Sequence, residues 1–406
     1  MSLLSIKNKI GIPSDWKMVP IGKVLISSQY GTSNGNSETG VPVVGMKNLQ
    51  DGKVDFNDLP FVSVSNEEKE SLLLHDGDIL LNRTNSYDLV GKIGFVDKAV
   101  EAVFASYLVR LQVDRAKSDP KFVALWLTSF WADQMIKKIA TRAVSQANVN
   151  PTEFKKFCLV PVLPKPEQKA IADLLSTWDE AIEKTERLIQ VKEAKLKGQI
   201  QKLISQRCDS WPHTKPKKIF DTITEKNFPD EELLSVTQDR GVIPRSMLEG
   251  RVMSPDGTTA SYKLIKRGDF AISLRSFQGG IEYSNYQGII SPAYTVLRPK
   301  IELSSDFYRL FFKSYIFIEK YLNLAVIGIR DGKQISIPDF LSIKIPVPPL
   351  EQQKEIAETL SVCQHEIDLL KQLAEKYKTQ KRGLMQKMLT GEWRIKPEIV
   401  NQYREA

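Results

Sequence analysis

The sequence contains few cysteines and few histidines. Of its 406 residues, three are cysteine and three are histidine. The cysteines Cys158, Cys208 and Cys363 are odd in number and far apart, which argues against a disulfide scaffold and favours a reducing, cytoplasmic location. No histidine lies near a pair of cysteines, so no zinc site is expected.

Long apolar runs are also missing. No stretch of about 18 apolar residues occurs, so we expect no transmembrane helix and no membrane partner. Residues 1–16 lack a long apolar core and a small-residue cleavage site, so no secretory signal is expected. The apolar share of 42% and the charged share of 26% are typical of globular proteins. A chain of this length suggests roughly two to four domains.

Catalytic motifs are absent as well. The sequence has no GxxxxGK[ST] phosphate loop and no GxGxxG that opens a helix. Residues 119–122 (Asp-Pro-Lys-Phe) resemble the Asp/Asn-Pro-Pro-Tyr/Phe motif of amino-methyltransferases, but lysine replaces the second proline, so we interpret them as a turn before a helix. The Pro-Asp pair at 255–256 has no acid-x-Lys partner before residue 331, unlike that of many nucleases. We therefore predict no catalytic residue, no metal site and no cofactor bound by this chain.

The net charge of +8 is unevenly distributed. The basic excess lies in residues 1–166 and 207–350, whereas residues 167–206 and 351–390 are nearly balanced. A basic excess suits a polyanionic partner, although many basic proteins bind no nucleic acid.

An internal repeat is present at an offset of 185 residues. A proline-rich stretch at 160–164 (VPVLP) precedes 168–172 (QKAIA), and 345–349 (IPVPP) precedes 353–357 (QKEIA). The alignment continues without a gap to residues 202 and 387. Because the repeat tolerates no insertion over some forty positions, we expect each copy to be one continuous element whose length matters.

Each copy has the pattern of a long helix. The prolines suit a helix N-terminus, and apolar residues then advance by alternating fours and threes, the heptad seam of a coiled coil. Two separate amphipathic helices, one on each domain, are the alternative, but five heptads in matching phase favour mutual pairing. The residues predicted to pair are Ile171, Leu175, Trp178, Ile182, Ile189, Leu196 and Leu203 in the first helix, and Ile356, Leu360, Ile367, Leu370, Tyr377, Leu384 and Met388 in the second.

The segments around the repeat also echo one another. Each opens with a tryptophan, at 16 and 211, and each has a Gly-Asp turn before an apolar run, at 77–78 and 268–269. Short β-branched and aromatic stretches punctuated by Gly, Asn and Asp indicate strands, and helical stretches follow near 119–140 and 305–322. We predict an α/β (α+β type) fold in the order globule, long helix, globule, long helix.

Polar, glycine-bearing loops are the remaining functional signal. Arg, Lys, Asn and Gln pair with base edges, Ser and Thr contact phosphates, and glycine permits close backbone approach. Each loop taken alone is more often an ordinary solvated turn, but two per globule favour DNA binding. The candidate contacts are Tyr30, Thr32, Asn34, Asn82, Arg83, Thr84, Asn85 and Lys92 in the first globule, and Arg275, Ser276, Gln278, Gly279, Arg330, Lys333 and Gln334 in the second.

These patterns together resemble the specificity subunits of type I restriction–modification systems. The repeated helices resemble the central and C-terminal conserved regions of that family, and residues 77–92 and 268–279 resemble its target-recognition domains. The tail at 384–394 (LMQKMLTGEWR) is similar to the family's ending, whereas residues 205–207 depart from it in the first copy.

The resemblance implies a DNA-reading subunit without catalysis. Such a subunit reads a two-part target in double-stranded DNA, docks two methyltransferase subunits that bind S-adenosylmethionine, and is joined by restriction and translocase subunits that use ATP and Mg²⁺. The implied domains are target-recognition domains at 1–160 and 208–345, a central conserved helix at 161–207, and a C-terminal conserved region at 346–406. The helices would act as a ruler between the half-sites.

Two other functional classes remain open at this point. One is an unrecognised nuclease or methyltransferase, which the missing motifs disfavour. The other is a stand-alone coiled-coil adaptor that binds only protein partners, which the paired polar loops disfavour. If the ruler exists, the first helix must carry the chain to a second globule at its far end, so we expect the two helices to pair antiparallel.

Overall fold

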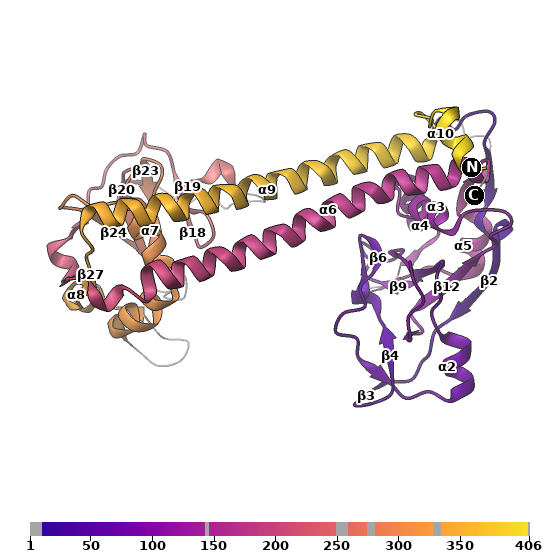
Figure 1. The fold of residues 1–406 in the computed structure, drawn as a ribbon, viewed down its shortest axis with the longest axis horizontal. Helices are drawn as coiled ribbons and strands as arrows, with labels where there is room; N and C mark the ends of the chain where they lie inside the picture. The colour runs from indigo at the N-terminus through magenta and orange to yellow at the C-terminus, as the bar shows by residue number, and fades with distance from the viewer. Residues whose placement is uncertain (1–9, 143–145, 249–258, 274–280, 328–333, 405–406) are drawn as a thin grey trace. The chain divides into compact units, whose positions relative to one another are not determined.

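The computed structural model describes residues 10–142, 146–248, 259–273, 281–327 and 334–404. They form two compact units, which we call unit 1 (residues 1–184 with 373–406) and unit 2 (residues 185–372). Each unit combines one globule with part of both long helices, α6 (Lys165–Ile200) and α9 (Leu350–Thr390), which Figure 1 shows running side by side. The fold is therefore the predicted one: two mixed α/β globules and two long helices that pair with each other.

The globule of unit 1 is built mainly from short strands. Its largest sheet has the order β2-β12-β8-β10-β6-β5 (Leu25–Tyr30, Leu108–Val113, Asp78–Asn82, Ile93–Phe95, Gly52–Val54, Leu49–Gln50). Smaller sheets are β11-β4-β7-β3 (Val103–Phe104, Val41–Val44, Phe61–Val62, Asn36–Ser37), β13-β14-β9 (Thr141–Arg142, Ala147–Asn148, Thr84–Asn85) and β1-β15 (Lys17–Pro20, Leu159–Val162). Its helices are α2 (Asn66–Leu72), α3 (Pro120–Leu127), α4 (Phe130–Ile139) and α5 (Pro151–Phe157), and α10 (Pro397–Gln402) lies near the C-terminus.

The globule of unit 2 repeats this plan with fewer described strands. Its main sheet has the order β17-β24-β21-β22 (Phe220–Ile223, Tyr294–Pro299, Phe270–Ser273, Ile281–Tyr283). Strand pairs are β18-β19 (Leu234–Thr237, Gly241–Pro244), β20-β23 (Lys263–Ile265, Gly288–Ile290), β25-β26 (Val326–Ile327, Gln334–Ile335) and β16-β27 (His213–Thr214, Ile345–Pro346). Its helices are α7 (Ser305–Lys313) and α8 (Ile337–Ser342).

In unit 1 the two long helices run antiparallel, as predicted. The Trp178 and Tyr377 rings meet edge to face with centroids 5.7 Å apart, and the Lys381 ammonium lies 2.6 Å from the Asp179 carboxylate. Ile171 and Met388 belong to one buried cluster with the aromatic core of the globule. The start of α6 therefore packs on the end of α9, and both helix ends complete the core of unit 1.

In unit 2 the other halves of the same helices also run antiparallel. Lys192 pairs with Glu366 at 2.6 Å, and Glu193 pairs with Lys371 at 2.6 Å. Beyond the end of α6, the indole Nε1 of Trp211 donates to Gln352 near the start of α9, at 3.1 Å. Later residues of α6 therefore meet earlier residues of α9, which only an antiparallel pair allows.

The predicted seam holds along both helices except at the end of α6. Seam residues from Ile171 to Leu196 and from Ile356 to Met388 are buried or half-buried. A π-helical turn at Gln201–Ser205 then inserts one extra residue into the helix. The seam therefore moves by one residue along the helix. Ile204 is fully buried, whereas Leu203, the residue predicted to lie in the seam, is only half-buried.

A buried glutamine fixes the globule of unit 1 to the start of α6. The Gln168 side chain is completely buried. Its Oε1 accepts the backbone N–H of Asp119, the N-cap residue of α3, at 2.8 Å, and its Nε2 donates to the Leu163 carbonyl at 2.8 Å. The Gln168 side chain thus satisfies the backbone N–H of a helix-capping residue and the carbonyl of a loop residue at the same time.

The second repeat makes the same attachment in unit 2. Gln353 is 2% exposed; its Oε1 accepts the backbone N–H of Ser304, the N-cap residue of α7, at 2.9 Å, and its Nε2 donates to the Pro348 carbonyl at 2.8 Å. All three positions lie 185 residues after their counterparts in unit 1. The repeat seen in the sequence is therefore a repeat of the joint between helix and globule.

Replacing these glutamines should destabilise the unit that contains them. In Gln168→Ala or Gln353→Ala, a buried N–H and a buried C=O lose their partner, and each unsatisfied group costs about 1–3 kcal/mol. We expect the free energy of unfolding of the affected unit to fall by that order in urea titrations. Gln190→Ala, on the exposed face of α6, is the control and should change it little. Equal stability of all three variants would contradict this role.

Candidate nucleic-acid interface

The Gly-Asp turns have a structural role in both globules. Asp78 is buried at the start of β8, accepts the backbone N–H of His75 at 2.9 Å, and lies 3.5 Å from the Arg110 guanidinium on β12. Asp269 likewise accepts the backbone N–H of Lys266 at 2.9 Å, and the Arg298 guanidinium on β24 donates to the Asp269 carboxylate at 2.8 Å. The aspartate of each turn therefore bonds within its own globule, and in unit 1 the turn leads through β8 to the polar segment that follows it.

The polar segment after β8 divides into buried and accessible side chains. Asn82 is completely buried; its Oδ1 accepts the Thr84 N–H at 3.3 Å, and its Nδ2 has no partner within the described residues. Arg83 is half-buried, with its guanidinium carbon 5.1 Å from the centroid of the Tyr30 ring. Thr84 and Asn85, also half-buried, form β9. Arg83 and Tyr30, more than fifty residues apart in the sequence, thus meet at one surface.

The loop after β2 approaches the neighbouring sheet closely. A Cβ on Gly31 would lie 2.0 Å from the Phe104 carbonyl oxygen, so only glycine fits there. Thr32 is 3% exposed, and its Oγ1 accepts the Asn34 N–H at 3.2 Å. Asn34 is exposed and donates to the Ser63 carbonyl at 2.8 Å. The structure therefore places the Thr32 and Asn82 side chains inside the globule, where they shape the loops and cannot reach a partner.

Lys92 lies beside this segment because two strands pair. The Asn82 N–H donates to the Lys92 carbonyl, and the Gly91 N–H donates to the Asn82 carbonyl, both at 2.8 Å. The Lys92 side chain is exposed. Unit 1 therefore presents an aromatic ring, two cations and several hydroxyl and amide groups on neighbouring segments.

Most candidates of unit 2 lie outside the described residues. These are Arg275, Ser276, Gln278, Gly279, Arg330 and Lys333. The segments that carry them begin and end on described strands, since β21 and β22 flank residues 274–280 and β25 and β26 flank residues 328–333. The backbone of Gln334 belongs to β26 and pairs with Ile327.

A buried carboxylate lies just after residues 274–280. Burial raises the pKa of Glu282 on β22 to about 7, and the ammonium of Lys313, which bonds its Oε1, opposes that rise. The Oε2 atom has no partner within the described residues. The pKa of Glu282 in the unfolded chain is lower, near 4.5. The stability of unit 2 therefore falls as the pH rises from about 4.5 to about 7, because the buried carboxyl group resists ionisation.

A small sheet next to Arg83 was not predicted from the sequence. Strands β13, β14 and β9 pair in that order, and the Arg142 guanidinium lies 3.4 Å from the centroid of the Tyr87 ring. Strands of two residues carry no period that a sequence pattern could reveal. The exposed Arg142 was the only available signal, and by itself it looks like any surface arginine.

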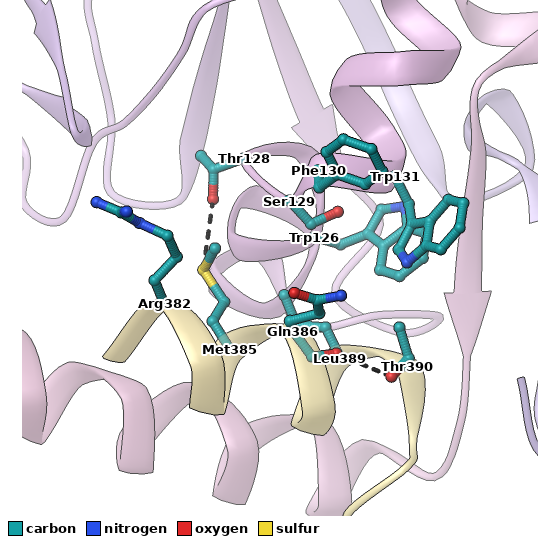
Figure 2. A pocket seen from close by; sticks show the side chains of 10 residues that line it. All are labelled: Trp126, Thr128, Ser129, Phe130, Trp131, Arg382, Met385, Gln386, Leu389 and Thr390. Atoms are coloured by element: carbon teal, nitrogen blue, oxygen red, sulfur yellow. Dashed lines mark hydrogen bonds between the residues drawn. The ribbon is translucent and has the colours of Figure 1, made fainter. Parts of the chain in front are cut away.

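A pocket of about 370 Å³ separates the α3–α4 junction from the end of α9 in unit 1 (Figure 2). Trp126 and Trp131 line one wall, and Met385 faces Thr128, whose hydroxyl lies 3.9 Å from its sulfur. Its lining has no cluster of acidic or histidine side chains. Across the described residues, no group of three or more His, Cys, Asp or Glu side chains could hold a metal ion.

The cysteines have the character of core residues. Burial raises the pKa of the Cys158 thiol to about 12 and that of Cys208 to about 11. Both are reduced, and Cys363 is half-buried in the helix seam. Thiols with such raised pKa values are poor nucleophiles at neutral pH.

Comparison with known families gives a match over most of the chain. The model of the type I restriction modification DNA specificity domain matches residues 13–193 and 256–378. The chain belongs to this family. Both matched ranges contain one globule segment followed by one long helix, so this specificity subunit carries the family's domain twice.

Relatives of the specificity subunit match over its full length. It is 27% identical to a Methanocaldococcus jannaschii protein provisionally named the type I restriction enzyme MjaX specificity subunit, covering 96% of each chain. It is 26% identical to the MjaVIII specificity subunit of the same organism, covering 95% of this chain and 94% of the relative. Among solved structures, the type I restriction–modification S subunit from M. genitalium is 17% identical with a TM-score of 0.58, covering 93% of this chain and 96% of that one.

The comparisons decide between the functional classes left open above. The protein is a non-catalytic DNA-recognition subunit of a type I restriction–modification system, and the nuclease, methyltransferase and stand-alone adaptor readings fall away. No helix formed by the described residues is both long and apolar enough to cross a membrane.

Proposed function

We propose that the specificity subunit reads a bipartite target in double-stranded DNA, with one half-site for each globule. The recognition domains would be residues 1–160 and 208–345, and the conserved helical regions 161–207 and 346–406. The observation that supports this most strongly is the equivalent attachment made by Gln168 and Gln353. Because each globule is joined in the same way to the start of a long helix, we expect equivalent faces of the two globules to read the DNA.

The accessible candidates are proposed as the DNA contacts. In unit 1, Arg83 and Lys92 supply positive charge, and Tyr30 gives Arg83 an aromatic support that limits its rotamers. Asn34, Thr84 and Asn85 add amide and hydroxyl groups that bases and phosphates accept. In unit 2 the corresponding proposal is made for Arg275, Ser276, Gln278, Gly279, Arg330, Lys333 and Gln334.

Substituting one arginine in each globule should relax only one half-site. Loss of a bidentate base contact costs about 1–3 kcal/mol at that base pair. We expect Arg83→Ala to lose discrimination in one half-site and Arg275→Ala in the other, measured on duplexes that vary one base pair at a time. Arg404→Ala, an exposed arginine near the C-terminus, is the control. Uniform weakening on every duplex would instead make that arginine a phosphate contact.

The long helices carry a second binding surface, which we call the apolar flank. It consists of the large apolar side chains exposed on α6 and α9: Leu174, Leu188, Val191, Val362, Leu369 and Leu373. Every one directly precedes a position of the heptad seam, and these positions include Lys192 and Ala374, which continue the same spacing of threes and fours. Successive helix residues are rotated by about 100°, and in an antiparallel pair the residues that precede the seam fall on the same side of both helices.

The opposite side of the pair is charged. Glu193 and Lys371, which bond each other, each directly follow a seam residue. The apolar flank therefore combines its exposed large apolar side chains with some charged neighbours, and the apolar side chains leave it able to pack against a further helix.

We propose that the apolar flank docks two methyltransferase subunits. Leu188 and its repeat counterpart Leu373 are both exposed and supply one equivalent anchor on each helix. The methyltransferase subunits would bind S-adenosylmethionine, and restriction and translocase subunits using ATP and Mg²⁺ would join through them. No cofactor is assigned to this chain.

A further inference from the structure

The paired strands β13 and β14 and the neighbouring strand β9 carry a row of polar side chains that lies outside the core of unit 1. Thr141 pairs with Asn148, and Asn148 pairs with Thr84. Ala147, the neighbour of Asn148 on β14, is 1% exposed and belongs to the core. Because neighbouring residues of a strand point to opposite faces, the row of Thr141, Asn148 and Thr84 points away from the core.

Two residues of the row have free hydrogen-bonding capacity, whereas the third, Thr84, accepts the Nε–H of Arg83 at 3.3 Å. Thr141 and Asn148 are exposed, and neither side chain forms a hydrogen bond with another described residue. The pairing strands lie about 4.8 Å apart, so the row is roughly 10 Å long. A row of this length is shorter than the width of the B-DNA major groove, which is about 12 Å, and an asparagine amide pairs bidentately with adenine.

Arg142 adds positive charge at the edge of the same hairpin. Its guanidinium lies over the Tyr87 ring at 3.4 Å from the centroid, which holds the cation in a defined place while the residue stays exposed. Within the described residues, no carboxylate forms an ion pair with it. An ordered, uncompensated arginine beside free amide and hydroxyl groups is complementary to a polyanion with hydrogen-bonding bases.

The hairpin has a counterpart in unit 2. Strand β25 begins at Val326, 185 residues after Thr141, and pairs with β26 as β13 pairs with β14. A capped short helix follows in both units, α5 after Asn150 and α8 after Ser336. The segment between β25 and β26 contains Arg330 and Lys333, which the sequence alone proposed as DNA contacts.

We infer that the paired strands β13 (Thr141–Arg142) and β14 (Ala147–Asn148) are a DNA-reading element of unit 1, with Asn148 as a base contact and Arg142 as its charged neighbour. The inference rests on the proposed division of the target into half-sites. It extends the contact surface from β9, which carries Thr84 and Asn85, across the whole sheet to β13.

The test uses the full-length chain and fluorescent duplexes. The target is first identified by mapping methylated bases in DNA from cells that contain the complete system. Binding is then measured for the cognate duplex and for duplexes with one changed base pair. We expect Asn148→Ala to raise the Kd for the cognate duplex roughly 5- to 150-fold and to abolish discrimination at one base pair of the unit 1 half-site.

Further variants separate the possible roles. Asn148→Asp keeps the shape but adds negative charge, so it should weaken binding to every duplex. Arg142→Ala should lower affinity, and recovery in Arg142→Lys would make Arg142 a phosphate contact, whereas no recovery would make it a base contact. Asn401→Ala, an exposed asparagine on α10, is the matched control.

The outcomes are distinguishable from failure of the proposed function. If Arg83→Ala relaxes a half-site while the Asn148 and Arg142 variants bind every duplex as the wild type does, the hairpin inference is wrong and the half-site proposal stands. If the wild-type chain does not discriminate among duplexes, the half-site proposal fails and the hairpin inference fails with it. Thermal unfolding of each variant confirms that the globule is intact.

Discussion

Inserting one heptad into each long helix should lengthen the preferred spacer between the half-sites by about three base pairs. Seven residues add about 10 Å of helix, and DNA rises 3.4 Å per base pair. The natural insertion points are after Lys184 in α6 and before Leu373 in α9, where the two compact units divide. Seven residues preserve the seam phase, so the pairing of both flanking halves is retained.

The same insertion should change the rotational setting of the half-sites. Three added base pairs rotate one half-site by roughly 100° about the DNA axis. We therefore expect affinity for the original spacer to fall by orders of magnitude, while the bases read in each half-site stay the same. Selection from a library of duplexes with varied spacers measures both effects.

Two controls make this result interpretable. Insertion of seven residues into α6 alone shifts one helix against the other and should destabilise the pair, which thermal unfolding reports. Insertion into the exposed turn at residues 238–240 leaves the helices unchanged and should leave the spacer unchanged. An unaltered spacer after the double insertion would show that the helices do not set the distance.

Charge placed on the apolar flank should prevent assembly with the methyltransferase. In Leu188→Glu and Leu373→Glu, burial of one leucine is lost and a carboxylate would have to be desolvated against an apolar partner. We expect each single variant to bind the methyltransferase more weakly than the wild type, and the double variant to bind none, with affinity reduced by roughly 100-fold or more. Sedimentation of the purified complexes measures the stoichiometry.

The matched control places the same charge on the other side of the helix. Gln190 directly follows the seam residue Ile189 and is exposed, so Gln190→Glu should leave assembly unchanged. Methylation of target DNA by the reconstituted complex should be lost in the double variant and retained in the control. Normal stoichiometry in the double variant would assign the docking site to another surface.

The sequence alone determined the architecture. The ungapped repeat and its heptad spacing predicted two long helices that pair, because a seam of alternating threes and fours leaves a continuous apolar edge that a partner helix must cover. The antiparallel direction followed from chain connectivity, since α6 must deliver the chain to a second globule before α9 returns. The resemblance to the specificity family followed from the same residues.

Tertiary structure decided which polar residues are accessible. Thr32, Asn82 and Arg83 look equally suitable in the sequence, yet only Arg83 has a side chain at the surface, because the strand pairings bury the other two. The hairpin at β13 and β14 was invisible, because strands of two residues are defined by their partners. The shift from Leu203 to Ile204 likewise arose from one π-helical turn that no periodicity signals. The local pattern of the chain determines the long helices, whereas the recognition surface depends on contacts between residues that are distant in the sequence.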